Sequence, residues 1–306
     1  MAGKVQRAER GEPAAAPWPA RAAGRLARGR FIAAGYSMRD MAGIESASNP
    51  LIREILRSIE NRTHFLLEGE KPILEAVAAG LGLEHVLHDE SVRPGRLAAA
   101  AAARPKLVSR GVLERLAETK TPQHLLAVVR RRDLPVAEIL GRPGPVVFLF
   151  GLQDPGNLGA VVRVAEATGC AGVLTAAGSA DFFHPRAVRA SAGSVLRIPV
   201  SGRVSFEPFA RDAKEARRLL CGAVPSGGED PFGAPLPAAS VLVIGSEGTG
   251  LPAGAYRYLD RRVTIPMQAP VDSLNAAVAA ALVLYAAKLA VASPALSGAE
   301  SRDGPS

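Results

Sequence analysis

The chain has 306 residues, 48% of them hydrophobic and 22% charged, so it can form two domains with substantial apolar cores. Its two cysteines, Cys170 and Cys221, form no Cys-x-x-Cys pair. This argues against a disulfide framework or a structural zinc site and favours a reducing cytoplasm. The formal net charge is +8, but residues 1–43 contain eight Lys or Arg against three Asp or Glu, leaving only +3 for the rest. Binding to a polyanion therefore has to be argued from local sites.

Residues 1–43 are rich in Ala, Gly, Pro and Arg and show no sustained periodicity, so we expect a mostly disordered basic tail. A solvated extension, a start codon assigned too far upstream and an Arg-rich transit peptide are the alternatives, and there is no secretory h-region. Residues 294–306 are expected to form a flexible C-terminal tail.

Residues 44–140 alternate between helix and strand patterns, which is typical of a small α/β domain. A helix at 49–59 carries Arg53 and Arg57 on a basic face, and a charged, then Gly/Pro-rich, stretch at 130–145 is interpreted as a linker. The pattern predicts further helices at 71–79 and 111–117 and strands at 65–69, 86–88, 107–109 and 125–129.

His85 and His88 have a spacing that could hold a metal ion. No acidic residue or cysteine clusters with them, so we expect ordinary surface or edge histidines and no metal site.

The second half of the chain opens with an apolar strand at residues 146–150, and a loop then leads into a helix closed by Gly169. A polar segment spans residues 184–194. The remaining pattern up to residue 241 predicts strands at 172–176, 197–200 and 221–224 and an amphipathic helix at 207–220.

Residues 241–284 combine a buried strand at 241–244, a glycine-rich loop, a second strand at 263–265 and a long apolar helix. Asp272 or Ser273 is the expected helix cap. The helix is expected to run to about Ala292 and has almost no polar face, so it should be buried in the domain or in a subunit interface. Lys288 and the high alanine content argue against a membrane span.

The loop after residue 244 contains Gly245, Gly248 and Gly250, which allow backbone N–H groups to approach a ligand closely. Its Gly-x-x-Gly-x-Gly spacing differs from the dinucleotide fingerprint. A purely structural turn is the alternative.

Asn157 and Arg163 stand six residues apart, so they cannot face the same way on one helix. Gly156 and Gly159 indicate that Asn157 still belongs to the loop at the helix N-terminus, a position suited to binding phosphate or locking the loop, with Arg163 one or two turns along. A structural Asn cap and a solvated Arg are the alternative.

Three segments, taken together, resemble in order and spacing the three motifs of the SpoU/TrmH class of RNA 2′-O-ribose methyltransferases in the SPOUT superfamily. They are Asp154-Pro-Gly-Asn157-Leu-Gly-Ala-Val-Val-Arg163, Ile244-Gly-Ser-Glu247-Gly-Thr-Gly250-Leu-Pro252 and Ile265-Pro-Met-Gln-Ala-Pro-Val-Asp-Ser273-Leu-Asn275. The upstream part is similar to the L30e-type substrate-binding domain of this class in Phe65-Leu-Leu-Glu68-Gly69-Glu70 and Thr119-Lys120-Thr121-Pro122-Gln123. The resemblance covers residues 45–292.

The resemblance implies an α/β fold with an L30e-like domain at residues 44–140 and a parallel-sheet domain at 141–293 that ends in a deep trefoil knot. Such a knot departs from the general rule that chains do not thread loops. It also implies a cytoplasmic homodimer packed through the knot helices, with no membrane attachment. The implied cofactor is S-adenosylmethionine, bound by Ile244, Gly245, Gly248, Gly250, Ile265, Pro266, Met267 and Leu274. Ser246 stands where many members carry Asn, which puts the hydrogen bonding of the loop in doubt.

The implied reaction moves a methyl group from a sulfonium to a ribose 2′-hydroxyl, so the enzyme has to align the two partners and help remove a proton. Family accounts make the motif-one arginine, here Arg163, the base. A guanidinium holds its proton too tightly for that, so we favour binding of the phosphate or the developing alkoxide and leave the proton acceptor open. The site residues implied by the motifs are Asn157, Arg163, Glu247, Ser273 and Asn275.

Large-subunit ribosomal RNA is the expected substrate because the accessory domain resembles that subgroup. Transfer RNA is the first alternative, and a non-catalytic RNA-binding or ribosome assembly factor is the second. The complete set of motif residues argues against a protein without catalysis.

Overall fold

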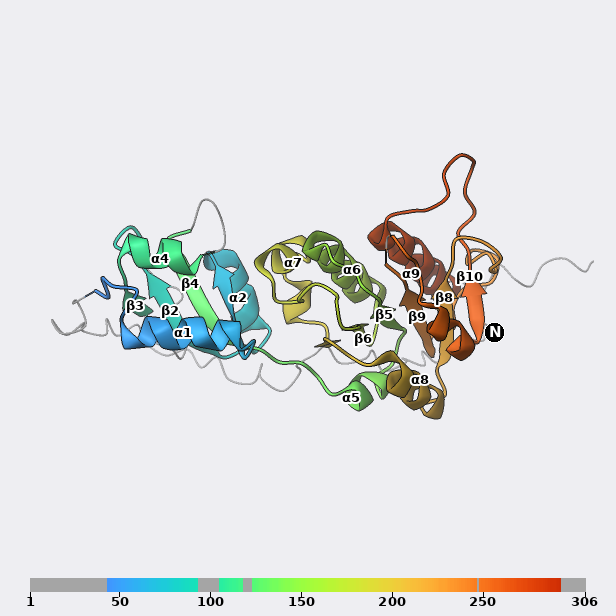
Figure 1. The fold of residues 1–306 in the computed structure, drawn as a ribbon, viewed down its shortest axis with the longest axis horizontal. Helices are drawn as coiled ribbons and strands as arrows, with labels where there is room; N and C mark the ends of the chain where they lie inside the picture. Colours follow the sequence, from blue (N-terminus) through green and yellow to red (C-terminus); the bar gives the residue numbers. More distant parts are fainter. Residues whose placement is uncertain (1–42, 93–104, 118–122, 247, 293–306) are drawn as a thin grey trace, which may run out of the picture.

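The structure is a computed structural model and describes residues 43–92, 105–117, 123–246 and 248–292. The expectations for both tails, for Glu247 and for residues 119–122 lie outside the described residues. The described chain forms two sheets, one in each half, with helix α2 (Glu70–Ala78) of the first half next to α7 (Pro185–Ala190) of the second (Figure 1). None of the described helices is long and apolar enough to cross a membrane.

The first half is built on a four-stranded sheet of order β1-β4-β2-β3. Strand β4 pairs antiparallel with β1 and β2, and β2 pairs parallel with β3. Asn49 caps the first helix by accepting a hydrogen bond from the backbone of Leu51. The predicted elements are confirmed to within a few residues: α1 (Pro50–Glu60), β1 (His64–Glu68), α2 (Glu70–Ala78), β2 (Leu83–His88), β3 (Pro105–Leu107), α4 (Arg110–Leu116) and β4 (Leu125–Arg130).

The second half contains a six-stranded sheet of order β10-β8-β9-β5-β6-β7 in which every pairing is parallel, as predicted. Its elements are α5 (Val136–Leu140), β5 (Val146–Leu149), α6 (Pro155–Thr168), β6 (Gly172–Thr175), α7 (Pro185–Ala190), η2 (Ser194–Leu196), β7 (Val200–Ser201), α8 (Phe206–Glu215), β8 (Leu219–Ala223), β9 (Ser240–Ile244), η3 (Ala253–Tyr258), β10 (Arg261–Val263) and α9 (Ala276–Ala292).

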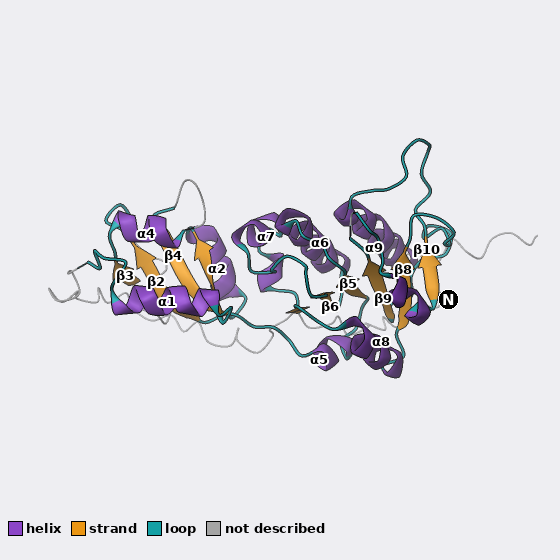
Figure 2. Cartoon of the chain, viewed as in Figure 1, coloured by secondary structure: helices purple, strands orange, loops and turns teal. Residues whose placement is uncertain are grey.

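Helices cover both faces of this sheet, with α6, α7 and α9 on one side and α5 and α8 on the other (Figure 2). Successive residues of β5 therefore pack into different cores: Val147 and Leu149 face α6 and α9, while Val146 and Phe148 face α8. Burial on both faces explains why the strands read as continuous apolar runs rather than as alternating ones.

Four boundaries in this half differ from the prediction. Helix α8 ends at Glu215 because Arg217 adopts a left-handed φ of 56°, so the predicted helix to residue 220 is too long and β8 begins earlier. A 3₁₀ turn occupies Ser194–Leu196 and delays β7 to Val200, and β10 lies two residues before the predicted strand.

The predicted linker contains an element that the sequence pattern did not reveal. Helix α5 packs Ile139 and Leu140 into the core beside α8. The buried guanidinium of Arg218 then donates to the backbone carbonyls of Leu140, Arg142 and Gly144, which holds this segment to the second sheet. Contacts with residues far along the chain stabilise this five-residue helix.

Both cysteines are free, and burial raises the pKa of each thiol to about 11. At pH 8 only about 0.1% of such a thiol is thiolate, against roughly a quarter for an ordinary cysteine. We expect the native protein to react with a disulfide reagent at pH 8 at least about 100-fold more slowly than the unfolded protein, measured spectroscopically. Rapid labelling of Cys221, which is fully buried, would contradict the structure.

Candidate functional site

A cavity of about 560 Å³ opens where three neighbouring strands of the second sheet end. Its walls come from the carboxyl ends of β8, β9 and β10, the glycine loop, the segment leading to α9 and the first turns of that helix. Ligand sites of parallel sheets form at this edge, and the volume is that of a small-molecule site. The lining residues are Ala223, Val224, Pro225, Ile244, Gly245, Ser246, Gly248, Thr249, Gly250, Tyr256, Val263, Ile265, Met267, Asp272, Ser273, Leu274, Ala276, Ala279 and Val283.

The glycine loop closes on itself. Ser246 and Gly250 exchange two backbone hydrogen bonds of 3.1 and 3.0 Å, and the Ser246 hydroxyl lies 2.7 Å from that of Thr249. The backbone of Gly250 passes so near Gly245 that a Cβ on Gly245 would lie 2.1 Å from the Gly250 carbonyl carbon. The hydroxyl of Ser246 thus provides hydrogen bonding at the position where many family members carry Asn.

Among the residues predicted to bind a cofactor, Pro266 is not part of the cavity wall, and the other seven line it. The sequence analysis missed Ala223, Val224 and Pro225, which carry no polar signature and reach the cavity because β8 ends beside β9. It also missed Tyr256, one of two tyrosines on η3.

Asn157 and Asn275 meet across 118 residues of chain, with the amide nitrogen of Asn275 donating to the Asn157 side-chain oxygen at 3.1 Å. Asn157 lies in the first turn of α6, so the prediction that it belongs to the preceding loop is wrong. The helix starts earlier because Asp154 caps it, accepting a hydrogen bond of 2.9 Å from the backbone of Asn157, and Pro155 follows at the first position. That hydrogen bond is the main cause that holds the pKa of Asp154 below its ordinary value, and the nearby Arg186 adds to it.

The start of α9 also differs from the prediction. Helix α9 begins at Ala276, and the side-chain oxygen of Asn275 accepts from the backbone of Ala277 at 2.9 Å, so Asn275 is the cap rather than Asp272 or Ser273. Lys288 near the other end donates to the carbonyl of Ala167 at the end of α6. The two helices therefore run side by side in the same direction, and Asn275 ties their first turns together at the edge of the cavity.

Ser273 lines the cavity two residues before this cap, and its hydroxyl lies 3.4 Å from Asp272. The structure therefore places Asn157, Ser273 and Asn275 near one another. Glu247 lies outside the described residues.

Arg163 is not part of this group. It is exposed on α6, about 9 Å further along the helix axis than Asn157 and about 120° around it. Among the described residues none forms a hydrogen bond or ion pair with its guanidinium. Arg163 is therefore available to an external anion.

Known families and relatives match both halves of the chain. Residues 144–285 match the SpoU rRNA Methylase family, and residues 57–127 match the MRM3-like substrate binding domain. The 23S rRNA (guanosine(2553)-2′-O)-methyltransferase RlmP of Bacillus subtilis is 31% identical over 251 residues, which cover 80% of this chain and 98% of that protein. The chain belongs to the SpoU rRNA methylase family.

Other SpoU family relatives extend this result to the fold. The 23S rRNA (uridine(2479)-2′-O)-methyltransferase of Streptomyces viridochromogenes is 33% identical, over 73% of this chain and 82% of that protein. The crystal structure of an AdoMet-bound rRNA methyltransferase from Sinorhizobium meliloti superposes with a TM-score of 0.72 at 26% identity and covers 81% of this chain and 97% of that one. The parallel-sheet fold is therefore that of SpoU methyltransferases.

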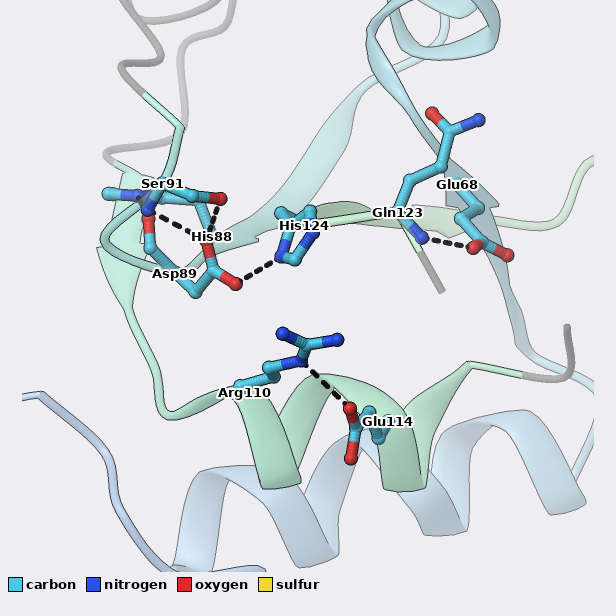
Figure 3. A network of polar contacts seen from close by, with 8 residues as sticks. All are labelled: Glu68, His88, Asp89, Ser91, Arg110, Glu114, Gln123 and His124. Carbon is cyan, nitrogen blue, oxygen red and sulfur yellow. Dashed lines mark hydrogen bonds and ion pairs between the residues drawn. The ribbon is translucent and has the colours of Figure 1, made fainter. Parts of the chain in front are cut away.

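The domain next to the SpoU methylase unit gathers polar side chains at one edge of its sheet (Figure 3). Glu68 accepts a 2.6 Å hydrogen bond from the backbone of Gln123, so two segments quoted for the family resemblance meet there. Burial of Asp89 works against its charged form, but hydrogen bonds from Ser91 and His124 hold its pKa below the ordinary value. This edge can therefore present both hydrogen-bond donors and acceptors.

Within the described part of the chain, neither histidine of β2 lies in a group that could hold a metal ion. The expectation of surface or edge histidines is wrong for His88, which is buried on an inner strand of the sheet. His88 contacts the carbonyl of Asp89 through Nδ1 at 2.9 Å, and burial is the main cause that lowers the pKa of His85. The described residues contain no cluster of three or more His, Cys, Asp or Glu side chains that could hold a metal ion.

Proposed function

We propose that this protein transfers the methyl group of S-adenosylmethionine to a ribose 2′-hydroxyl of large-subunit ribosomal RNA. The observation that carries the proposal is the cavity between the glycine loop and the segment 265–274, with the Asn157–Asn275 contact at its edge. Relatives that span most of the chain are named as 23S rRNA 2′-O-methyltransferases, which favours ribosomal over transfer RNA. The protein would meet that RNA in the cytoplasm.

The residues of the cavity fit this cofactor. Its volume suits a nucleoside with an amino-acid chain, and the wall combines apolar side chains with backbone groups of the glycine loop. A Cβ added at Gly248 or Gly250 would meet nothing within 4 Å, so the loop leaves open space. We infer that Ile244, Gly245, Ile265, Met267 and Leu274 bind the cofactor largely through backbone groups.

The roles of the polar residues follow from their places. When bound, the cofactor supplies an electrophilic methyl group, and methyl transfer to the ribose oxygen releases the hydroxyl proton. Asn157 and Asn275 hold the first turns of α6 and α9 together, and Ser273 faces the cavity. We propose that Arg163 binds the RNA phosphate or the developing alkoxide, because its guanidinium is exposed and has no described partner.

The test combines calorimetric titration of S-adenosylmethionine with methyl transfer to naked large-subunit rRNA and mapping of the modified ribose. Binding together with one mapped 2′-O-methyl site supports the proposal. Cofactor binding with methyl transfer only to tRNA would show that tRNA, rather than ribosomal RNA, is the substrate. Absence of cofactor binding would favour a non-catalytic RNA-binding or assembly factor and overturn the proposal that the protein is an enzyme.

We further propose the domain division and the knot. Residues from 44 to about Arg131 would bind RNA, and the methyltransferase unit would begin near Leu134, since Leu134, Ile139 and Leu140 pack against the second sheet.

Strand β10 is at the outer edge of that sheet, whereas α9 packs on α6, so the chain returns across β8 and β9. Threading of this returning segment into a trefoil knot would account for two loops that line one cavity.

We also propose a homodimer formed through α9. This helix exposes large apolar side chains at Val278, Tyr285 and Leu289, which share one face at helical spacing. Leu289→Glu is expected to convert a dimer into monomers in sedimentation velocity at micromolar concentration, while the circular dichroism spectrum stays that of the folded chain because Leu289 is 61% exposed in the protomer. Phe232→Glu changes an exposed apolar residue in a loop and is the matched control. It should leave the mass of the dimer unchanged. A wild-type monomer that binds cofactor would contradict the dimer.

A further inference from the structure

A partly buried ion pair joins the two domains. Arg131 directly follows β4 of the first sheet, and Asp181 lies between β6 and α7 of the second. The two guanidinium NH groups of Arg131 donate to the two carboxylate oxygens of Asp181 at 2.6 and 2.8 Å. Only 12% of the Arg131 side chain and 21% of the Asp181 side chain are exposed. Such a two-bond pair fixes orientation as well as distance.

Two aromatic rings surround this pair. Phe65 of β1 and Phe183 lie 4.5 Å apart between ring centroids, both buried, and the Arg131 guanidinium lies 4.7 Å above the Phe183 ring. The carboxylate of Asp181 also accepts a 2.9 Å hydrogen bond from the backbone of Phe183. The Asp181 carboxylate therefore positions both the Phe183 ring and the Arg131 guanidinium at this interface between the two domains, which is called the joint below.

A second contact brings the first domain to the helix that carries Arg163. The carboxylate of Glu75 on α2 lies against Gly193, where a Cβ would approach its oxygen to 2.1 Å. Gly193 precedes Arg197, which donates to both oxygens of Glu166 on α6 at 2.7 and 2.9 Å. Glu166 follows Arg163 by one turn of the helix.

The apolar core is continuous across the joint. Phe65, Ile73 and Val129 of the first domain belong to the same buried cluster as Phe183, Leu196 and Ile198 of the second. Domains connected by a linker alone move relative to each other by default, whereas a packed apolar interface with a two-bond ion pair resists such motion.

We propose that Arg131 is a positioning residue: with Asp181 it fixes the angle between the two domains, so that RNA bound by the first domain presents one ribose at a set distance from Arg163 and the cavity. This inference rests on the proposed function. It makes the joint a determinant of which nucleotide is methylated, although Arg131 touches neither the reacting atoms nor the cofactor cavity.

The test uses the full chain with Arg131→Ala, Arg131→Lys and the charge exchange R131D/D181R. Small-angle X-ray scattering reports domain arrangement, calorimetry reports S-adenosylmethionine affinity, and steady-state methylation of naked large-subunit rRNA with ribose mapping reports KM, kcat and the chosen site. Arg211→Ala, which removes an exposed 3.6 Å pair with Glu207 on α8, is the matched control and should behave as wild type.

The expected result for Arg131→Ala is a larger radius of gyration, cofactor affinity within about 2-fold, and a KM for RNA raised about 10-fold or more with additional methylated riboses. Arg131→Lys keeps the charge but loses the forked geometry, so it should fall between wild type and Ala. The charge exchange should recover part of the loss. Its recovery is limited because Arg62 lies 4.0 Å from Asp181 and would repel an arginine there.

Several outcomes would overturn the inference. The first is an Arg131→Ala protein that scatters like wild type and methylates the same ribose with the same KM. If that variant fails to fold, Arg131→Lys decides: wild-type scattering and site choice would refute the positioning role, and added sites would support it. A different outcome separates the two proposals. If the wild-type protein methylates no RNA but the scattering still changes on substitution, the proposed function is refuted, while the role of Arg131 in fixing the domain arrangement is supported.

Discussion

Replacing Arg163 with alanine is expected to lower methyl transfer by about 10²-fold or more, the usual scale for a positioned catalytic group, with cofactor affinity changed by no more than a few-fold. The guanidinium is exposed, and none of the described residues is bonded to it. Its removal should therefore leave the melting temperature within about 1 °C, since substitutions away from structural contacts cost little stability. Calorimetry and single-turnover methylation measure the two effects separately.

Arg163→Lys separates two roles for this side chain. Lysine keeps the positive charge but loses the forked donor geometry, and an amine releases its proton more readily than a guanidinium. Activity lost at every pH, with cofactor still bound, would support binding of phosphate or alkoxide. Substantial activity that rises with pH would instead favour a base at this position and contradict the role proposed here.

Much of the fold follows from local sequence patterns. Strands β5, β6 and β9 are short, continuous apolar runs in the sequence, because helices cover both faces of the sheet. Helix α6 has a cap at Asp154 and a left-handed Gly169 at its end, and both residue types mark helix ends in a sequence. The alternating order of helices and strands was therefore predictable from these patterns, whereas the parallel sheet was expected from the family resemblance.

Features that depend on distant residues were not predictable in this way. The cap of α9 is Asn275 because its amide is held by Asn157, 118 residues earlier. Helix α5 exists because the second core receives Ile139 and Leu140, and nothing in its own five residues announces a helix. Arg131 is the middle one of three consecutive arginines, and only the folded chain shows that it is the one paired with Asp181.

The cavity was predictable only in part for the same reason. Glycine spacing marks Gly245 and Gly250, because close backbone approach requires residues without a side chain. Ala223, Val224 and Tyr256 reach the cavity through the order of strands in the sheet, which local periodicity does not contain. Gly156 and Gly159 favour a loop at Asn157, whereas Asp154 caps the helix and Pro155 is its first residue.

Gly245→Ala is expected to weaken S-adenosylmethionine binding by about 10- to 100-fold. The structure gives the reason: the new Cβ would lie 2.1 Å from the Gly250 carbonyl carbon and force the glycine loop open. Overpacking of this kind costs about 1–3 kcal/mol, and each 1.4 kcal/mol is tenfold in affinity. Because the loop forms one wall of the cavity, the cost should fall on cofactor affinity more than on turnover at saturating cofactor.

Gly254→Ala is the matched control for this substitution, since a Cβ there meets nothing within 4 Å and the residue does not line the cavity. Calorimetry of both variants, with melting temperatures to exclude unfolding, decides the matter. A Gly245→Ala protein that binds cofactor as tightly as the Gly254→Ala protein would mean that the loop opens without cost. The cofactor would then have to be held by the opposite wall, where Ile265, Met267 and Leu274 line the same cavity.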